Sequence, residues 1–195
     1  MKKYFYLFYI IVISILLIQP VPANYEEDYK ELDSHKRVIE DAKYILETET
    51  TPEETRLQIY ANLRQAYTYT QKGNWKEGFN KLINSGNKIF GLFSNDIEEA
   101  KKAGQANTPE MDMVAESFMD RAEELYYLYL ETCYLTGIQA LIMKKYDTAK
   151  LYFGVFTTKP FDFKNPKMEK GYRLLRTLAF IKLGEVDKNL PKTKP

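Results

Sequence analysis

Cysteine and histidine, two residue types that often build catalytic and metal sites, are almost missing from this chain. Its 195 residues include one cysteine, Cys133, and one histidine, His35. One cysteine cannot form an internal disulfide. A catalytic triad of ordinary type would require Cys133 and His35 to lie side by side in the fold. The motifs H-E-x-x-H, G-x-S-x-G and G-x-x-x-x-G-K are absent as well. We therefore predict a protein that is not an enzyme and has no metal or other cofactor.

The two scarce residues also have ordinary surroundings. Cys133 falls on an apolar helical stripe, which predicts a buried and inert thiol. His35 lies beside the apolar face of an expected helix, where a solvated or hydrogen-bonded imidazole is typical.

An excess of one charge is missing too. The chain has 28 Lys and Arg against 27 Asp and Glu, with a net charge of +1 and no long block of either sign. A nucleic-acid partner would usually leave a basic face. We therefore predict no nucleic-acid partner.

Alternating strand patterns are absent, whereas apolar steps of three and four residues run through most of the chain. This predicts an all-α fold, with one domain at residues 24–190 and a disordered tail at residues 191–195. The expected helices cover residues 24–47, 51–71, 74–87, 95–103, 108–144, 147–157 and 167–183, with a loop at residues 104–107. The pattern over residues 108–144 is unusually long, so a break near residues 128–132 and a coiled coil both remain open.

Residues typical of helix ends mark several of the expected helices. The predicted N-caps are Thr51, Asn74, Thr108 and Asn165, three of which directly precede proline. Gly184 is predicted to end the last helix.

Three stretches share small residues, a turn and aromatics at matching intervals. The first runs through Gly137, Ala140, Tyr146, Ala149, Phe153, Phe156 and Pro160; the second through Ala66, Tyr69, Gly73, Trp75, Gly78 and Leu82; the third through Thr177, Phe180 and Gly184. These stretches resemble the tetratricopeptide repeat (TPR), a helical hairpin of about 34 residues. The turns at Gly73, Lys144 and Gly184 lie 71 and 40 residues apart, which leaves room for a degenerate repeat between residues 90 and 126.

The resemblance implies a TPR-like α-solenoid, an antiparallel helix-pair array of about three and a half repeats. An ordinary α-helical bundle is the alternative. In the family, positions of each repeat's first helix line a concave binding surface, and the matched positions here are Tyr60, Arg64, Tyr67 and Gln71. In the next matched repeat the corresponding positions are Tyr134, Ile138 and Leu141. This set is apolar, which indicates either an apolar groove or a shifted register of the match. Residues 24–46 could instead pack over the first row and bury its tyrosines.

The resemblance further implies a non-enzymatic scaffold or adaptor for protein–protein interaction, binding a partner polypeptide in a bacterial periplasm or cell envelope. A small-molecule-binding accessory protein of a solute transporter is one alternative. A secreted surface or virulence protein is another.

The first 23 residues are predicted to form a signal peptide. Lys2 and Lys3 precede an apolar run at residues 4–18, and Val21-Pro22-Ala23 offers a cleavage site. We expect residues 1–23 to be removed and the chain to be exported, periplasmic or extracellular, with membrane contact only before cleavage. An uncleaved anchor is the alternative, although the run is shorter than the roughly 20 apolar residues of a spanning helix.

Purified mature protein should therefore begin at or near Asn24. N-terminal sequencing checks this expectation, and Met1 in a membrane fraction would contradict it.

Overall fold

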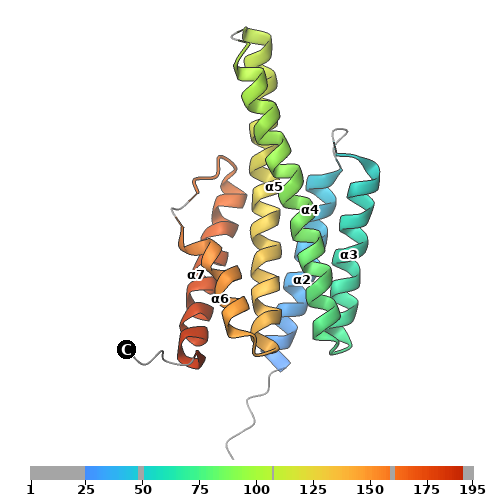
Figure 1. The fold of residues 1–195 in the computed structure, drawn as a ribbon, viewed down its shortest axis with the longest axis vertical. Coiled ribbons are helices and arrows are strands. Elements are labelled where there is room, and N and C mark those ends of the chain that lie inside the picture. The colour runs from blue at the N-terminus through green and yellow to red at the C-terminus, as the bar shows by residue number, and fades with distance from the viewer. Residues whose placement is uncertain (1–24, 48–50, 107, 159–160, 191–195) are drawn as a thin grey trace, which may run out of the picture.

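The computed structural model describes residues 25–47, 51–106, 108–158 and 161–190, with side chains from Ser34 onward. The elements are α2 (Tyr25–Leu46), α3 (Glu53–Gln71), α4 (Trp75–Gly104), α5 (Pro109–Ile142), α6 (Tyr146–Gly154), the 3-10 turn η1 (Val155–Thr157) and α7 (Pro166–Asn189). No strand occurs in these ranges, so the predicted all-α class is confirmed (Figure 1). The expected signal peptide and tail lie outside the described residues.

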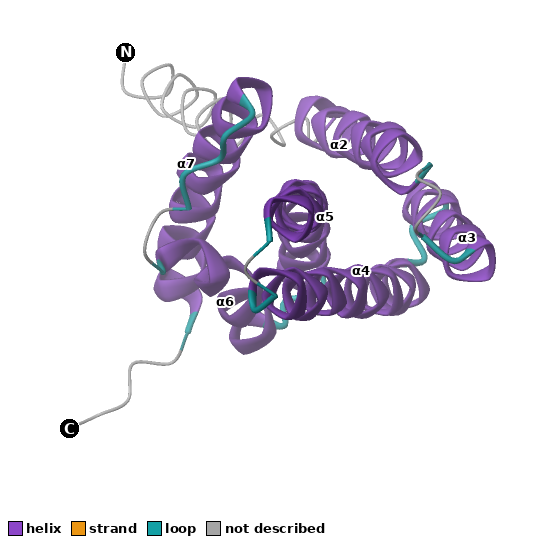
Figure 2. Cartoon of the chain, turned by 90° about the horizontal axis from the view of Figure 1, so that it is seen from above, coloured by secondary structure: helices purple, strands orange, loops and turns teal. Residues whose placement is uncertain are grey.

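Helix α5 stands at the centre of the arrangement. It packs against α4 along a long hairpin, and also contacts α2, α6 and α7 (Figure 2). Helix α3 packs against α2 and α4, on the side away from α6 and α7. The upper ends of α4 and α5 project together beyond the other helices (Figure 1). The hairpin therefore has a base inside the bundle and a tip outside it.

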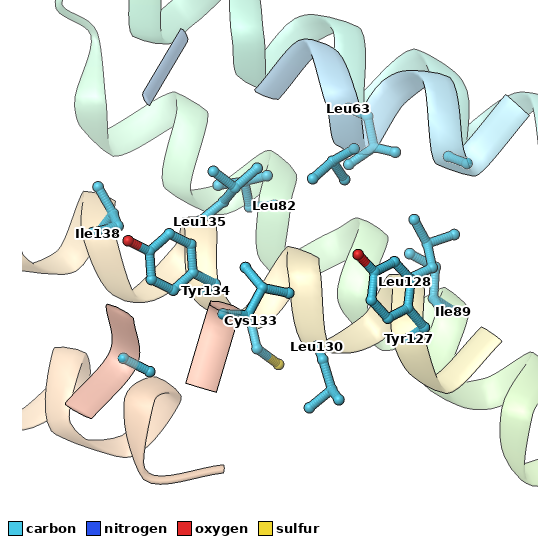
Figure 3. Close-up of a cluster of buried hydrophobic side chains, with 14 of the residues drawn as sticks. Leu63, Leu82, Ile89, Tyr127, Leu128, Leu130, Cys133, Tyr134, Leu135 and Ile138 are labelled. Carbon is cyan, nitrogen blue, oxygen red and sulfur yellow. The ribbon is translucent and has the colours of Figure 1, made fainter. Parts of the chain in front are cut away.

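The core lies around the lower half of α5. Every residue from 130 to 140 is buried, so this part of the helix faces protein on all sides. Neighbouring helices contribute Leu63, Leu82 and Ile89, which pack near Leu128 and Leu135 (Figure 3). Burial of such aliphatic side chains stabilises the fold by about 1.5–3 kcal/mol each.

Two small residues of the repeat-like pattern lie at close helix contacts. A Cβ added at Gly137 of α5 would lie 2.7–2.9 Å from the Phe153 ring of α6. Ala149, also on α6, has no exposed surface. Both positions favour small residues because a larger side chain would meet a neighbour that is already in place.

Helix continuity differs from the sequence-based expectation at three places. The predicted helices at residues 74–87 and 95–103 are one helix, α4, and the break considered near residues 128–132 of α5 is absent. Gly184 does not end α7, which continues to Asn189. A glycine inside a helix costs only about 1 kcal/mol, and packing outweighs that cost. A Cβ added at Gly86 of α4 would lie 3.5 Å from the Thr132 side chain of α5, and Val186 beyond Gly184 is fully buried.

The predicted N-cap positions are confirmed at three of four ends, and two of those three residues make side-chain capping bonds. Thr108 Oγ1 accepts a hydrogen bond from the Met111 amide at 3.3 Å, and Asn165 Oδ1 accepts from the Lys167 amide at 2.9 Å. Helix α3 instead has Pro52 at its N-cap, so the Thr51 assignment is wrong by one position. Asn74 is the N-cap of α4 but makes no side-chain capping bond, because its ψ of 68° is outside the extended range of capping residues.

Among the described helices, none combines the length and apolar character that a membrane span requires.

Replacing Ala149 by Trp should lower the free energy of unfolding by about 1–3 kcal/mol or more, because the site has no spare volume. Leu151→Trp is the matched control, since Leu151 lies two residues away on α6 and is 73% exposed. Thermal melts of both variants test the packing, and equal midpoints would contradict it.

Candidate functional site

The predicted row on α3 is partly covered by α2. Tyr60 Oη donates to the backbone oxygens of Ala42 at 3.1 Å and Lys43 at 2.9 Å, so this hydroxyl caps the C-terminal end of α2. The Tyr67 ring lies 6.2 Å from the His35 ring of α2, measured between centroids. Two of the four residues therefore hold a helix of the same chain.

The other members of the row are more accessible. Arg64 and Gln71 are exposed, and Gln71 Nε2 donates to Tyr67 Oη at 2.9 Å. Tyr134 lies apart from the row, buried with its ring 5.9 Å from that of Phe153 on α6. Ile138 is buried as well. The structure brings the α3 residues together and places Tyr134 elsewhere.

A buried polar cluster joins α2, α3, α4 and α5 beneath this row. Gln139 Nε2 of α5 donates to Thr70 Oγ1 of α3, and lies 3.3 Å from His35 Nε2 of α2. A Cβ on Gly78 of α4 would come within 3.0 Å of the Gln139 amide oxygen, so glycine leaves room for that amide. Burial lowers the pKa of His35 to about 4, which keeps the imidazole neutral near pH 7.

A buried carboxyl group lies two turns away along the same side of α5. The Glu131 side chain is fully buried, and its Oε1 accepts from Arg37 Nε of α2 at 3.1 Å. Burial raises the pKa of Glu131 to about 8, and the nearby charge of Asp41 acts in the same direction. Burial also raises the pKa of Asp41 itself. Glu131 is therefore mostly protonated at neutral pH.

A groove over α5 begins above this pair, between α2 and α7. It consists of two adjoining clefts that share Asn165 and Met168, and we call the two together the α5 groove. The first cleft, of about 140 Å³, is lined by Asp41, Tyr44, Ile45, Tyr127, Asn165, Lys167 and Met168. The second, of about 440 Å³, is lined by Asp120, Glu123, Glu124, Lys164, Asn165, Pro166 and Met168.

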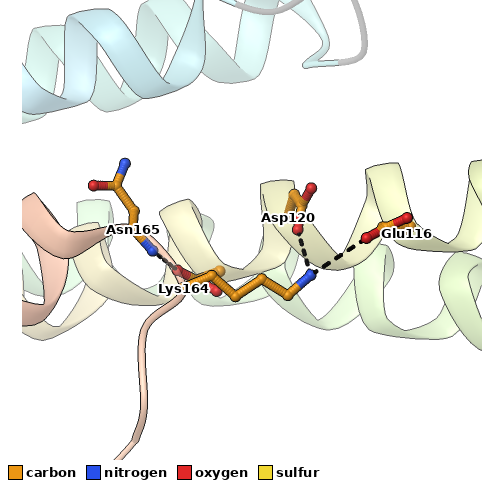
Figure 4. A network of polar contacts seen from close by, with 5 residues as sticks. Glu116, Asp120, Lys164 and Asn165 are labelled. Atoms are coloured by element: carbon orange, nitrogen blue, oxygen red, sulfur yellow. Dashed lines mark hydrogen bonds and ion pairs between the residues drawn. The ribbon is translucent and has the colours of Figure 1, made fainter.

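The α7 side of the groove is fixed to α5 by polar contacts. Glu123 Oε1 accepts from the Asn165 amide at 3.1 Å, at the N-terminal end of α7. Lys164 Nζ lies 2.8 Å from Asp120 Oδ1 and 3.9 Å from Glu116 Oε1 (Figure 4). Burial and the neighbouring carboxylates raise the pKa of Glu124. The groove therefore carries more negative than positive side chains.

The sequence reasoning did not identify the α5 groove. Its residues come from α2, from α5, and from the start of α7 with the loop before it, which are far apart in the chain, and none forms a local motif. The sequence did contain one indication near the groove, because Glu131 is the only charged residue between Leu125 and Ile142 of α5. A carboxyl group at a buried helix position needs a hydrogen-bonding partner. A search for that partner among the basic residues of the sequence could have led to α2.

Among the described residues, no three His, Cys, Asp or Glu side chains are grouped so as to hold a metal ion. No family model matches the chain, and comparisons with curated proteins and with solved structures return no match.

The raised pKa of Glu131 predicts a stability loss at rising pH. Between pH 4.5, its ordinary pKa, and about 8, the folded chain retains a proton that the unfolded chain releases, so the free energy of unfolding falls as pH rises. The lowered pKa of His35 has the opposite effect, so that it makes the free energy of unfolding rise with pH, but only between about pH 4 and its ordinary pKa of 6.5. We therefore expect the melting temperature to fall between pH 6.5 and 8, and to fall much less in Glu131→Gln.

Glu40→Gln is the control, because Glu40 is an exposed glutamate on α2. A Glu131→Gln variant that keeps the wild-type slope between pH 6.5 and 8 would show that another group is responsible.

Proposed function

We propose that this chain is an exported, non-enzymatic scaffold that binds a partner polypeptide on a TPR-like helix array. In this proposal α3, α5 and α7 are the first helices of successive pairs and form the inner layer. Helices α4 and α6 form the outer layer. Two sets of contacts support this order, since α4 packs against both α3 and α5, and α6 packs against both α5 and α7. Among the described residues the backbones of α3 and α5 do not pack directly against each other, and α2 packs against both.

One observation carries the proposal: a helix, α2, packs against two of the three helices assigned to the inner layer. Helix α2 lies against both α3 and α5, on the side opposite α4 (Figure 2). Tyr60 and Tyr67, two of the residues predicted to bind a partner, contact this helix. A surface that accommodates one helix beside α5 has the shape to accommodate a second segment next to it.

The space for that second segment is the α5 groove. Helix α2 covers the α3 side of α5, and the groove remains open between α2 and the start of α7. An open groove favours a polypeptide, whereas a small-molecule binder would favour a pocket closed on all sides. Exposed Tyr44 on the α2 wall is a suitable anchor, because tyrosine is common at the centre of protein interfaces.

Site-specific photo-crosslinking tests the proposal in cells that express the full chain. p-Benzoylphenylalanine at position 44 should give adducts of discrete mass that contain a second polypeptide. Position 151 is the matched control, because Leu151 lies on α6 of the proposed outer layer and its exposure of 73% is close to the 76% of Tyr44. Adducts of the same mass and yield at both positions, or none at position 44, would contradict a binding face in the groove.

A further inference from the structure

We infer that the α5 groove, together with the free face of α5 above it, binds a cationic amphipathic helix of the partner. The inference rests on the proposed function, because it names the chemistry of the segment that the same groove would hold.

Charge on α5 points to a cationic partner. Glu116, Asp120, Glu123 and Glu124 follow one another at steps of four, three and one, which places them on one side of the helix. That side faces away from α4, because Arg121 and Leu125 face α4 or the core: Arg121 pairs with Asp96 of α4, and Leu125 is buried. Burial is the main cause of the raised pKa of Glu124, and the charges of Asp120 and Glu123 act in the same direction. A cationic ligand would relieve the repulsion among these carboxylates.

The basic residues of the groove do not balance these carboxylates. The two clefts and Glu116 together present five acidic side chains, Asp41, Glu116, Asp120, Glu123 and Glu124, against Lys164 and Lys167. Lys164 already lies within 4 Å of Asp120 and Glu116. An acidic membrane surface or a nucleic acid would be repelled by this face, whereas Lys and Arg side chains would be attracted.

Apolar side chains accompany the acidic face, which points to an amphipathic partner and not to a purely basic one. Met113 is 74% exposed one turn above Glu116, and Met119 is 45% exposed on the flank of the same helix. Tyr44 adds an exposed ring on the α2 wall. Methionine side chains are flexible and polarizable, and they suit surfaces that receive apolar helix faces.

The dimensions of the face fit a helix. Met113 and Tyr127 are 14 residue steps apart on α5, which corresponds to about 21 Å at 1.5 Å per residue. A helix of about four turns would cover that length. Helix α2 provides an internal precedent, because it lies along the lower part of α5 and contacts it through Arg37 and Glu131.

A designed peptide probe tests the inference on the full mature chain. A fluorescein-labelled, 18-residue helix of leucine and lysine, with leucine on one face, should bind by fluorescence anisotropy. Two further probes separate charge from apolar contact: one replaces lysine by glutamate, the other replaces leucine by serine. We expect the first probe to bind at least tenfold more tightly than either of the others, with an affinity that falls as salt is raised.

Two variants locate the binding. Glu116→Lys with Asp120→Lys should weaken binding of the leucine–lysine probe at least tenfold. The matched control, Glu98→Lys with Glu99→Lys, makes the same charge change on α4 and should alter it less than threefold. If the reversed charges disturb folding, as checked by thermal melts, Glu116→Gln with Asp120→Asn removes the charge alone and should still weaken binding.

Equal effects of the α4 and α5 variants, or equal binding of the serine–lysine probe, would overturn the inference. The outcome is separable from that of the proposed function. If position 44 gives polypeptide adducts but the cationic probe does not bind, the proposed scaffold function is kept and the inference of a cationic amphipathic partner is refuted. No adducts at position 44 would contradict the proposed binding face in the groove, whether or not the cationic probe binds.

Discussion

Residues 130–140 of α5 are buried around the whole circumference of the helix, and the other helices are arranged to cover it. Most of these residues are apolar, and Thr132 and Thr136 donate to backbone oxygens of α5 itself. Glu131 and Gln139 need partners on other helices, because a buried polar group without a partner costs about 1–3 kcal/mol. Helix α2 supplies partners for both, Arg37 for Glu131 and His35 for Gln139. The position of α2 against α5 is therefore fixed by polar contacts as well as by apolar burial.

These polar contacts do not make α2 an especially stable part of the fold. A polar pair of this kind gains little over a well-packed apolar one, because the fully buried Glu131 carboxyl group loses its hydration, while Arg37 stays partly exposed. Protonation of Glu131 and neutrality of His35 limit that loss near pH 7, at the cost of a stability that depends on pH. The same contacts give α2 a specific register on α5, since displacing the helix would leave Glu131 and Gln139 without these partners.

The α5 groove follows from this arrangement. Helix α2 covers one side of α5, and the start of α7 is fixed on the other side through Glu123 and Asn165. Above both helices the hairpin of α4 and α5 continues beyond the rest of the described chain, so none of the described helices lies opposite the acidic side of α5 there (Figure 1). A face that is covered by helices at its base and free at its tip is where an additional helix would add burial with least rearrangement.

The sequence alone determined the helical class, most of the helix starts, the cap at Thr108 and the need for small residues at Gly137 and Ala149. Each of these is recorded in neighbouring residues, through apolar periodicity, proline and capping side chains. Tertiary packing decided that α4 continues through Gly91 and that α7 continues through Gly184. Burial against other helices outweighed the free-energy cost of a glycine inside a helix.

The candidate site was also decided by tertiary structure. Tyr60 and Tyr67 do lie on one side of α3, as the helical spacing predicts, but only the fold places α2 against them. Arg37 and Glu131 are separated by 94 residues, and no local pattern connects them. Local periodicity specifies which side of a helix is buried, while the identity of the helix that covers it depends on contacts between distant parts of the chain.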